Sequence, residues 1–180
     1  MNYFKHFDGL AFSILERMQA AGDLPDGIDL STGYTRVKTP EELFETADTV
    51  SIHSPHTDET RGIINGNLLG RMKSKGIVIN TARGPIVDLD AMYEALKAGT
   101  PAGAALDVLP VEPADTSHPL VKAYMNNEEW LKGRFMITPH AAFYSPPGLH
   151  DLRSKAVATV AQRLQDGSTR NCQNLNFLVD

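Results

Sequence analysis

Short apolar runs alternate with amphipathic segments along the chain from residue 49 onward. Runs of this length that end at polar or turn residues are typical of buried strands, and apolar positions three or four apart are typical of helices. The pattern predicts strands at 49–53, 76–80, 104–108 and 135–137, and helices at 65–72, 88–98 and 147–164. Because helices that separate apolar strands connect parallel neighbours, the sequence predicts an α/β fold with a parallel sheet.

The amino-terminal part follows a less regular pattern. Residues 8–21 carry apolar side chains at helical spacing and predict a helix that ends at Gly22. These side chains are Phe12, Ile14, Leu15 and Met18. A turn at 24–27 and a short strand at 35–37 then lead to a helix that begins near Pro40.

Two segments near the carboxyl end are interpreted differently. We interpret residues 110–133 as a long polar excursion that includes Pro113, Pro119 and the single tryptophan, Trp130. In the last helix, one apolar face predicts packing on the sheet rather than a seam for a partner. That face consists of Ala156, Val157, Val160 and Leu164.

Composition limits the classes of protein to consider. A chain of 180 residues, 42% hydrophobic, can bury one core and is too short for two full-sized α/β domains. A net charge of −5 gives no electrostatic reason to expect nucleic acid or an anionic membrane as partner. The single cysteine, Cys172, excludes an internal disulfide. With no spanning apolar run and no signal or transit pattern, we expect a cytoplasmic location.

Three residues with useful chemistry follow three successive predicted strands. Arg83, Glu112 and His140 each lie a few residues beyond the end of a strand. Because the carboxyl ends of parallel strands share one edge of the sheet, where α/β proteins bind ligands, we expect these side chains to converge on one cleft.

The three side chains suit chemistry on a small organic acid. The Arg83 guanidinium can hold a carboxylate through two parallel hydrogen bonds. The His140 imidazole can donate or accept a proton near neutral pH, and the Glu112 carboxylate at its second nitrogen would fix its tautomer. No serine or cysteine is placed as an activated nucleophile. Carboxylate binding combined with proton transfer indicates redox chemistry at C2 of a 2-keto or 2-hydroxy acid.

Each residue also has a purely structural explanation. Arg83 could be an ion-paired surface residue, Glu112 could begin a loop, and His140 could bind a backbone carbonyl. Their occurrence at three successive strand ends favours the functional interpretation.

Other polar residues near the strand ends are ambiguous. His53 and His56 are three residues apart and have no third ligand cluster, so we do not predict a metal site. Asp107 either accepts a hydrogen bond from a ligand amide or caps the following turn.

Long motifs make the chain similar to a known family. Residues 78–88, residues 104–108 with Glu112 and Pro113, and residues 138–142 resemble the NAD-binding domain of the D-isomer-specific 2-hydroxyacid dehydrogenases. The similarity covers about residues 24–174.

Within that family, the subgroup of the C-terminal-binding proteins looks most similar. Its animal members are NAD(H)-sensing corepressors as well as dehydrogenases. Residues 24–27, 143–145 and 170–172 carry this likeness.

The resemblance implies a Rossmann-type sheet with helices on both faces. It divides the chain into an amino-terminal helical segment of uncertain role (1–23), a partial NAD-binding domain (24–146), and a carboxyl-terminal helix and tail left from a substrate domain (147–180).

The resemblance also implies roles for individual residues. Arg83 would bind the substrate carboxylate, His140 would be the acid–base, Glu112 would be its partner, and Phe143 would line the substrate pocket. The implied NAD contacts are His53, Ser54, Pro55, Thr60, Thr81, Ala82, Arg83, Asp107, His140 and Ala142. NADP stays open, because the residue that selects between the two cofactors has no counterpart in the chain.

The chain departs from the family in its phosphate-binding turn. Dinucleotide binding in this fold uses a glycine-rich turn after the first strand, and the chain has no G-x-G-x-x-G. Gly62, Gly66 and Gly70 have the wrong spacing, and Asp23 is a displaced substitute for the expected acidic residue. We therefore expect a truncated Rossmann fold that lacks its first strands, exposes an apolar sheet edge and binds the cofactor weakly.

Two functions follow from these observations. The first is an NAD-dependent oxidoreductase that acts on a small 2-keto or 2-hydroxy acid, with a homodimer as the family expectation. The alternative is a remnant that has lost its activity and acts as an interaction or corepressor-like module, for which a nuclear location would fit.

Overall fold

The computed structural model describes residue 37 and residues 39–168. The chain divides into two compact units, and the boundary in the sequence lies between His140 and Ala141. Several predicted features lie outside the described residues: the helix at 8–21, the turn at 24–27, most of the strand at 35–37, Asp23, and Cys172 with its neighbours. The predicted boundary at 23/24 lies there too, and the division into three parts stays a prediction.

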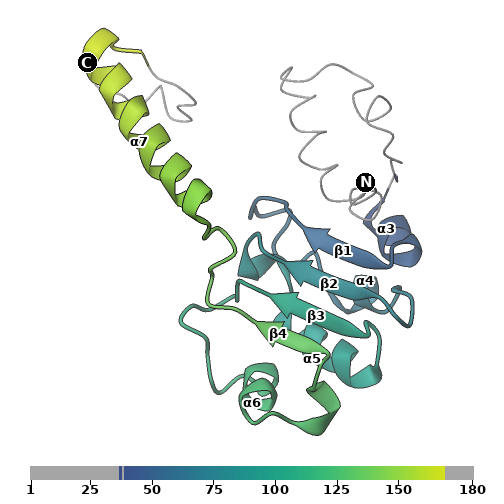
Figure 1. Ribbon diagram of the computed structural model, residues 1–180. Coiled ribbons are helices and arrows are strands. Elements are labelled where there is room, and N and C mark those ends of the chain that lie inside the picture. The colour runs from purple at the N-terminus through teal and green to yellow at the C-terminus, as the bar shows by residue number, and fades with distance from the viewer. Residues whose placement is uncertain (1–36, 38, 169–180) are drawn as a thin grey trace. The chain divides into compact units, whose positions relative to one another are not determined.

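The first unit contains one parallel sheet with the strand order β1-β2-β3-β4 (Figure 1). The strands are β1 (Thr49–Ile52), β2 (Ile77–Asn80), β3 (Gly103–Leu106) and β4 (Phe135–Ile137). All four were predicted from the apolar runs. In register, Asn80 lies beside Leu106 and Leu106 beside Ile137, so the last three strands end at the same level.

The helices of this unit begin at residues that cap them. Thr39, Asn65 and Asp88 each accept a hydrogen bond from a backbone N–H of the first turn, as is typical of these residue types at a helix N-cap. The helices are α3 (Pro40–Thr46), α4 (Gly66–Leu69), α5 (Leu89–Ala98) and α6 (Pro119–Met125), with short 3-10 turns η1 (Gly84–Ile86) and η2 (Glu129–Leu131).

The polar excursion at 110–133 contains two elements that the sequence pattern did not predict, α6 and η2. The helix α6 is short, and its N-cap is His118, whose Nδ1 accepts from the Leu120 N–H. Leu120 and Val121 are buried against the core, so tertiary packing stabilises a helix too short to give a periodic signal.

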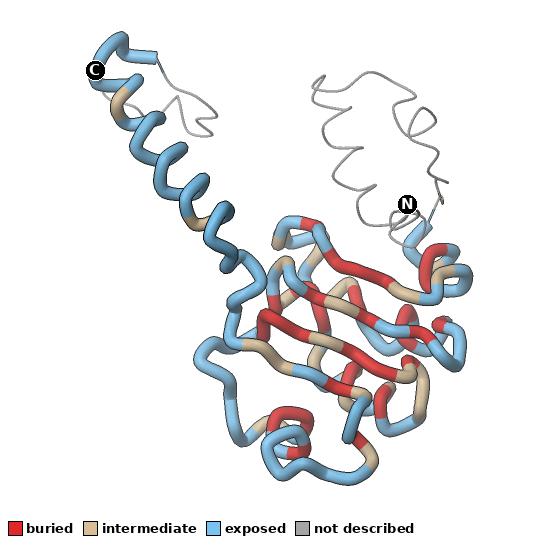
Figure 2. Tube along the Cα trace, in the orientation of Figure 1, coloured by how far each residue is buried: buried red, intermediate tan, exposed pale blue. Residues whose placement is uncertain are grey.

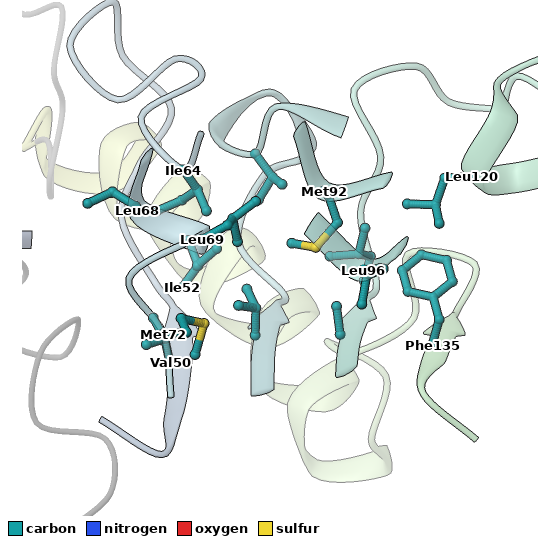
Figure 3. Close-up of a cluster of buried hydrophobic side chains, with 14 of the residues drawn as sticks. Val50, Ile52, Ile64, Leu68, Leu69, Met72, Met92, Leu96, Leu120 and Phe135 are labelled. Atoms are coloured by element: carbon teal, nitrogen blue, oxygen red, sulfur yellow. The ribbon is translucent and has the colours of Figure 1, made fainter. Parts of the chain in front are cut away.

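One hydrophobic core lies between the sheet and its helices (Figure 3). Alternate strand residues point into it, including the row Val50, Val78, Ala104 and Phe135. They pack with Leu69, Met92, Leu96 and Leu120 from α4, α5 and α6. Figure 2 shows these buried positions repeating along the strands. Right-handed crossovers between consecutive parallel strands explain why the connecting helices share one face.

The opposite face of the sheet, here called the open face, consists of Thr49, Ser51, Ile77, Ile79, Gly103, Ala105 and Met136. Met136 is 54% exposed and Ile77 is 42% exposed on it. The parallel Rossmann-type sheet is confirmed, but the described residues place helices on one face, and those predicted for the second face are not among them.

The second unit contains one long helix, α7 (Pro146–Asp166). Ser145 caps it, and Gly167 ends it with a φ of 74°. The predicted packing of its apolar face on the sheet stays a prediction. None of the described helices combines the length and apolarity needed to cross a membrane.

Candidate active site at the carboxyl ends of the strands

Asn80 shapes the loop that carries Arg83. The Asn80 side chain is fully buried at the end of β2. Its Oδ1 accepts from the Ala82 N–H at 3.0 Å, and its Nδ2 donates to the Arg83 carbonyl at 3.0 Å. A buried amide with both groups satisfied fixes the backbone at both residues, so the strand delivers Arg83 in a defined loop.

Gly84 joins this loop to the one after β3. A Cβ at Gly84 would lie 2.0 Å from the carbonyl carbon and oxygen of Leu109. Only glycine allows the two backbones to approach this closely. The loop that carries Arg83 is therefore packed directly on the loop that leads to Glu112.

Glu112 and His140 form the central interaction of the site. Glu112 Oε2 lies 2.8 Å from His140 Nδ1, and Glu112 Oε1 accepts from the Leu109 N–H at 2.9 Å. The two side chains are 40% and 47% exposed, so the pair is accessible to a ligand. This contact is the one that the sequence predicted between the strand ends.

The hydrogen bond of His140 lowers the pKa of the Glu112 carboxyl, and the Leu109 N–H lowers it further. Partial burial and the charge of Asp107 oppose these effects without reversing them. Glu112 is therefore an anion at neutral pH. A carboxylate at Nδ1 fixes the orientation of the imidazole ring and leaves Nε2 for a substrate.

His140 has a backbone conformation that is rare outside glycine. Its φ is 52°, in the left-handed region. The His140 N–H donates to the carbonyls of Asp107 at 2.9 Å and Thr138 at 3.0 Å, which hold the turn in place. Strained residues of this kind are concentrated at functional sites.

Arg83 lies on the loop next to this pair and is exposed. Its Nη1 donates to the Ala82 carbonyl at 2.6 Å. The structure thus brings Glu112 and His140 into contact and places Arg83 at the end of the adjacent strand. All three follow strands that end at one edge of the sheet, and the convergence of their side chains on one cleft stays a prediction.

Asp107 follows β3 and is buried, with 5% of its surface exposed. Its Oδ1 accepts a hydrogen bond from the Thr138 hydroxyl. The Asp107 N–H donates to the Asn80 carbonyl and its carbonyl accepts from His140. The residue therefore links β2, β3 and the His140 turn, and neither of its two predicted roles is excluded.

The loop after β1 holds the other predicted cofactor residues. His53 Nε2 lies 2.8 Å from the Ser51 hydroxyl, and Ser54 is buried. The Thr60 hydroxyl donates to the Pro55 carbonyl at 2.7 Å and closes the loop. The predicted contacts of these residues with a cofactor stay predictions.

Sequence reasoning missed two residues that build the site. Asn80 and Gly84 organise the loops that carry Arg83 and Glu112. Their roles depend on contacts with neighbouring backbone, which the sequence alone does not show. His56 was considered only as a metal ligand. Its Nε2 is occluded from solvent and has no hydrogen-bond partner in the structure. No cluster of metal-binding side chains occurs among the residues that the structure describes.

Ala142 and Phe143 belong to the second unit, so their predicted roles toward cofactor and substrate are not tested. Phe143 is exposed, and its ring meets Tyr144 edge-on with centroids 6.4 Å apart.

The residues present fit one half of NAD better than the other. Near the strand ends, buried Asp107 and the backbone at Thr81 and Ala82 carry polar groups of the kind that hold a nicotinamide. For the pyrophosphate, the sequence contains no glycine-rich turn that would present a helix N-terminus.

Comparison with known proteins agrees with this arrangement. The family model for the "D-isomer specific 2-hydroxyacid dehydrogenase, NAD binding domain" matches residues 20–142. A glyoxylate reductase from Korarchaeum cryptofilum is 42% identical over 124 residues, and one from Thermofilum pendens is 52% identical over 82 residues. These alignments cover 69% and 46% of this chain but only 33% and 24% of the relatives.

Solved structures show the same similarity. The NAD-complexed form of a D-isomer-specific 2-hydroxyacid dehydrogenase from Lactobacillus delbrueckii ssp. bulgaricus superposes with a TM-score of 0.69 and 26% identity. A D-lactate dehydrogenase from a Sporolactobacillus species gives 0.68 and 28%. Each comparison covers 90% of this chain, and 52% and 53% of those chains respectively.

Proposed function

The chain belongs to the D-isomer-specific 2-hydroxyacid dehydrogenase family, whose NAD-binding domain it matches, and from this we propose that it catalyses the reversible NAD-linked reduction of a small 2-keto acid to the D-hydroxy acid. The observation that carries the proposal is the hydrogen bond between Glu112 and His140 at the strand ends, with Arg83 on the adjacent loop.

Arg83 binds the carboxylate of the 2-keto acid in this proposal. A guanidinium stays charged at any working pH and offers two parallel N–H donors to the two carboxylate oxygens. Asn80 and Gly84 contribute by fixing the loop from which Arg83 extends. The carbonyl at C2 is thereby oriented and polarised next to His140.

His140 moves the proton. In the direction of reduction, protonated His140 donates from Nε2 to the carbonyl oxygen, which becomes the hydroxyl. Glu112 holds Nδ1 and stabilises the imidazolium before the transfer. In the direction of oxidation, neutral His140 takes the hydroxyl proton back. When bound, the nicotinamide cofactor exchanges a hydride with C2.

Cofactor binding rests on the groups at the strand ends. In this proposal, Asp107 and the backbone at Thr81 and Ala82 hold the nicotinamide end, and His53, Ser54, Pro55 and Thr60 of the loop after β1 lie along the cofactor. Because the chain has no G-x-G-x-x-G, we expect a lower affinity than a complete dinucleotide fold has, by several kcal/mol at about 1.5–3 for each charged hydrogen bond. NAD is the cofactor that the family match supports.

Titration with NADH tests this function directly. The purified chain is titrated with NADH by fluorescence, and oxidation of NADH at 340 nm is followed with glyoxylate, pyruvate and longer 2-keto acids. We expect millimolar or tighter NADH binding and turnover that depends on the keto acid. If no NADH signal is seen at millimolar concentration, the chain is instead an interaction module without activity. The intact Glu112–His140 pair argues against that alternative.

Assembly and location are further parts of the proposal. A homodimer is the family expectation, and light scattering coupled to gel filtration measures it. A cytoplasmic location fits the substrate class, and subcellular fractionation tests it.

A further inference from the structure

A cavity of about 370 Å³ lies next to the two loops that carry Arg83 and Glu112, and the proposed function does not use it. Pro85 and Leu109, which belong to these loops, form part of its wall. None of the three proposed catalytic residues lines it. Its volume is within the range of about 300–1,000 Å³ that is typical of small-molecule pockets. The cavity is therefore large enough for a ligand and separate from the candidate active site.

The fold fixes the walls of this cavity. They come from the segment between β1 and α4, the start of α5, the loop after β3 and the start of α6. The Gly62 N–H donates to the Pro85 carbonyl at 2.8 Å and holds the first of these segments in place. Val87, Leu109 and Val121 belong to the hydrophobic core and give the cavity an apolar floor.

Most of the charged groups in the cavity are carboxylates. Asp88, Asp90 and Asp115 line it, and Arg61 is the only lysine or arginine among the described residues that do so. Hydrogen bonds from the Ser117 hydroxyl and N–H lower the pKa of Asp115, which keeps this carboxyl ionised at neutral pH. Because an ionised carboxylate has about four acceptor positions, each aspartate can accept a hydrogen bond from a ligand besides those within the chain.

His118 also lines the cavity but does not neutralise these carboxylates. Its Nδ1 accepts a hydrogen bond from the Leu120 N–H at 3.2 Å, as the N-cap of α6. An imidazole nitrogen that accepts carries no proton, so the ring is neutral and its Nε2 donates to Asp90 Oδ1 at 3.1 Å. The lining thus has three negative charges and one positive charge, which leaves a net charge of −2.

We propose that this cavity binds a small organic cation, in which an amine or guanidinium is attached to an apolar group. The apolar floor contacts the carbon skeleton, and the carboxylates accept hydrogen bonds from the cationic group. A 2-keto acid does not fit, because its carboxylate would meet a net negative charge. The cavity is a second ligand site and not an extension of the substrate site.

Nuclear magnetic resonance with 2-phenylethylamine tests the proposal on the purified chain. We expect saturable shifts of the amide signals of Gly62, Val87 and Val111, with a dissociation constant of about 1 mM or lower, which a ligand of about nine non-hydrogen atoms can reach. The alcohol 2-phenylethanol has nearly the same shape and no charge. It should bind about tenfold more weakly or worse, because a hydrogen bond to a charged group contributes at least that factor.

A double variant removes charge from the cavity and keeps the local hydrogen bonds. In Asp90→Asn with Asp115→Asn, the amide oxygens can still accept the hydrogen bonds that Oδ1 of each aspartate accepts. The affinity for 2-phenylethylamine should fall by about tenfold or more. Glu94→Gln with Glu129→Gln changes the net charge equally outside the cavity, and it should leave the affinity unchanged.

Three results would overturn the proposal. Absence of saturable binding of 2-phenylethylamine would show that the cavity holds no such cation. Equal affinity for 2-phenylethanol would show that the carboxylates do not select the ligand. Binding that is lost in Glu112→Gln and kept in the double variant would assign the amine to the candidate active site. None of these measurements uses NADH or a keto acid, so they are independent of the proposed function.

Discussion

Glu112 Oε2 and His140 Nδ1 lie 2.8 Å apart, although 28 residues separate them in the chain. The contact connects the loops after β3 and β4, and it leaves the other imidazole nitrogen for a substrate. Four predictions follow from this pair and from the loops around it.

Glu112→Gln should lower kcat/KM for keto-acid reduction by about 10²-fold, and His140→Ala by at least as much, because positioned acid–base groups contribute on the order of 10²–10⁴-fold. Glutamine keeps the size of the side chain but loses the charge that stabilises the imidazolium. Steady-state oxidation of NADH measures the effect, and Glu94→Gln on α5 is the control. Full activity in His140→Ala would contradict the assignment of the acid–base.

Arg83→Gln should raise KM for the keto acid by about 10- to 100-fold, since a hydrogen bond to a charged group contributes about 1.5–3 kcal/mol. NADH affinity, measured by fluorescence, should change much less. Arg71→Gln, which removes a surface ion pair with Glu45 and a hydrogen bond to Asn67, is the matched control. An unchanged KM would show that the carboxylate is bound elsewhere.

Gly84→Ala should lower the free energy of unfolding by about 2–3 kcal/mol, in the range for inserting a group into a packed site. The added Cβ would overlap the Leu109 carbonyl, so the two loops have to separate. Urea denaturation measures the loss. Gly66→Ala, with its nearest neighbour 4.0 Å away, should leave stability unchanged or slightly raised. Equal stability of both variants would mean that the loops do not pack as described.

The stability difference between the wild-type chain and Glu112→Gln should depend on pH. The pKa of Glu112 is lowered in the folded chain by His140 and Leu109. Its ionised form therefore stabilises the fold fully above the ordinary glutamate pKa of about 4.3, and this contribution is lost as the pH falls through the lowered pKa. Urea denaturation at pH 7 and pH 3.5 measures it. A difference that grows toward acid pH would contradict the sign of the shift.

The positions of the strands and of the residues that follow them could be predicted from the sequence, because each depends only on the order of apolar and polar residues within a short segment. The run before Asn80 is apolar and short, so its end, and hence the position of Arg83, is defined by the next polar residue. Glu112 and His140 follow from the same rule applied to two further strands.

Other features could not be predicted because they depend on neighbours distant in the chain. The helix α6 forms only because Leu120 and Val121 meet the core. The need for glycine at 84 arises from Leu109, 25 positions away, and the left-handed turn at His140 is held by carbonyls of Asp107 and Thr138. A pattern along one segment contains no information on such contacts.

The left-handed backbone at His140 opposes the stability of the fold to its proposed activity. Glycine at this position would release the chain from a conformation that costs an ordinary residue about 1–3 kcal/mol. A laboratory selection for heat resistance alone would therefore favour replacing the imidazole. A selection for thermostability in this protein therefore has to test activity at every round. Otherwise it enriches stable variants that no longer transfer a proton.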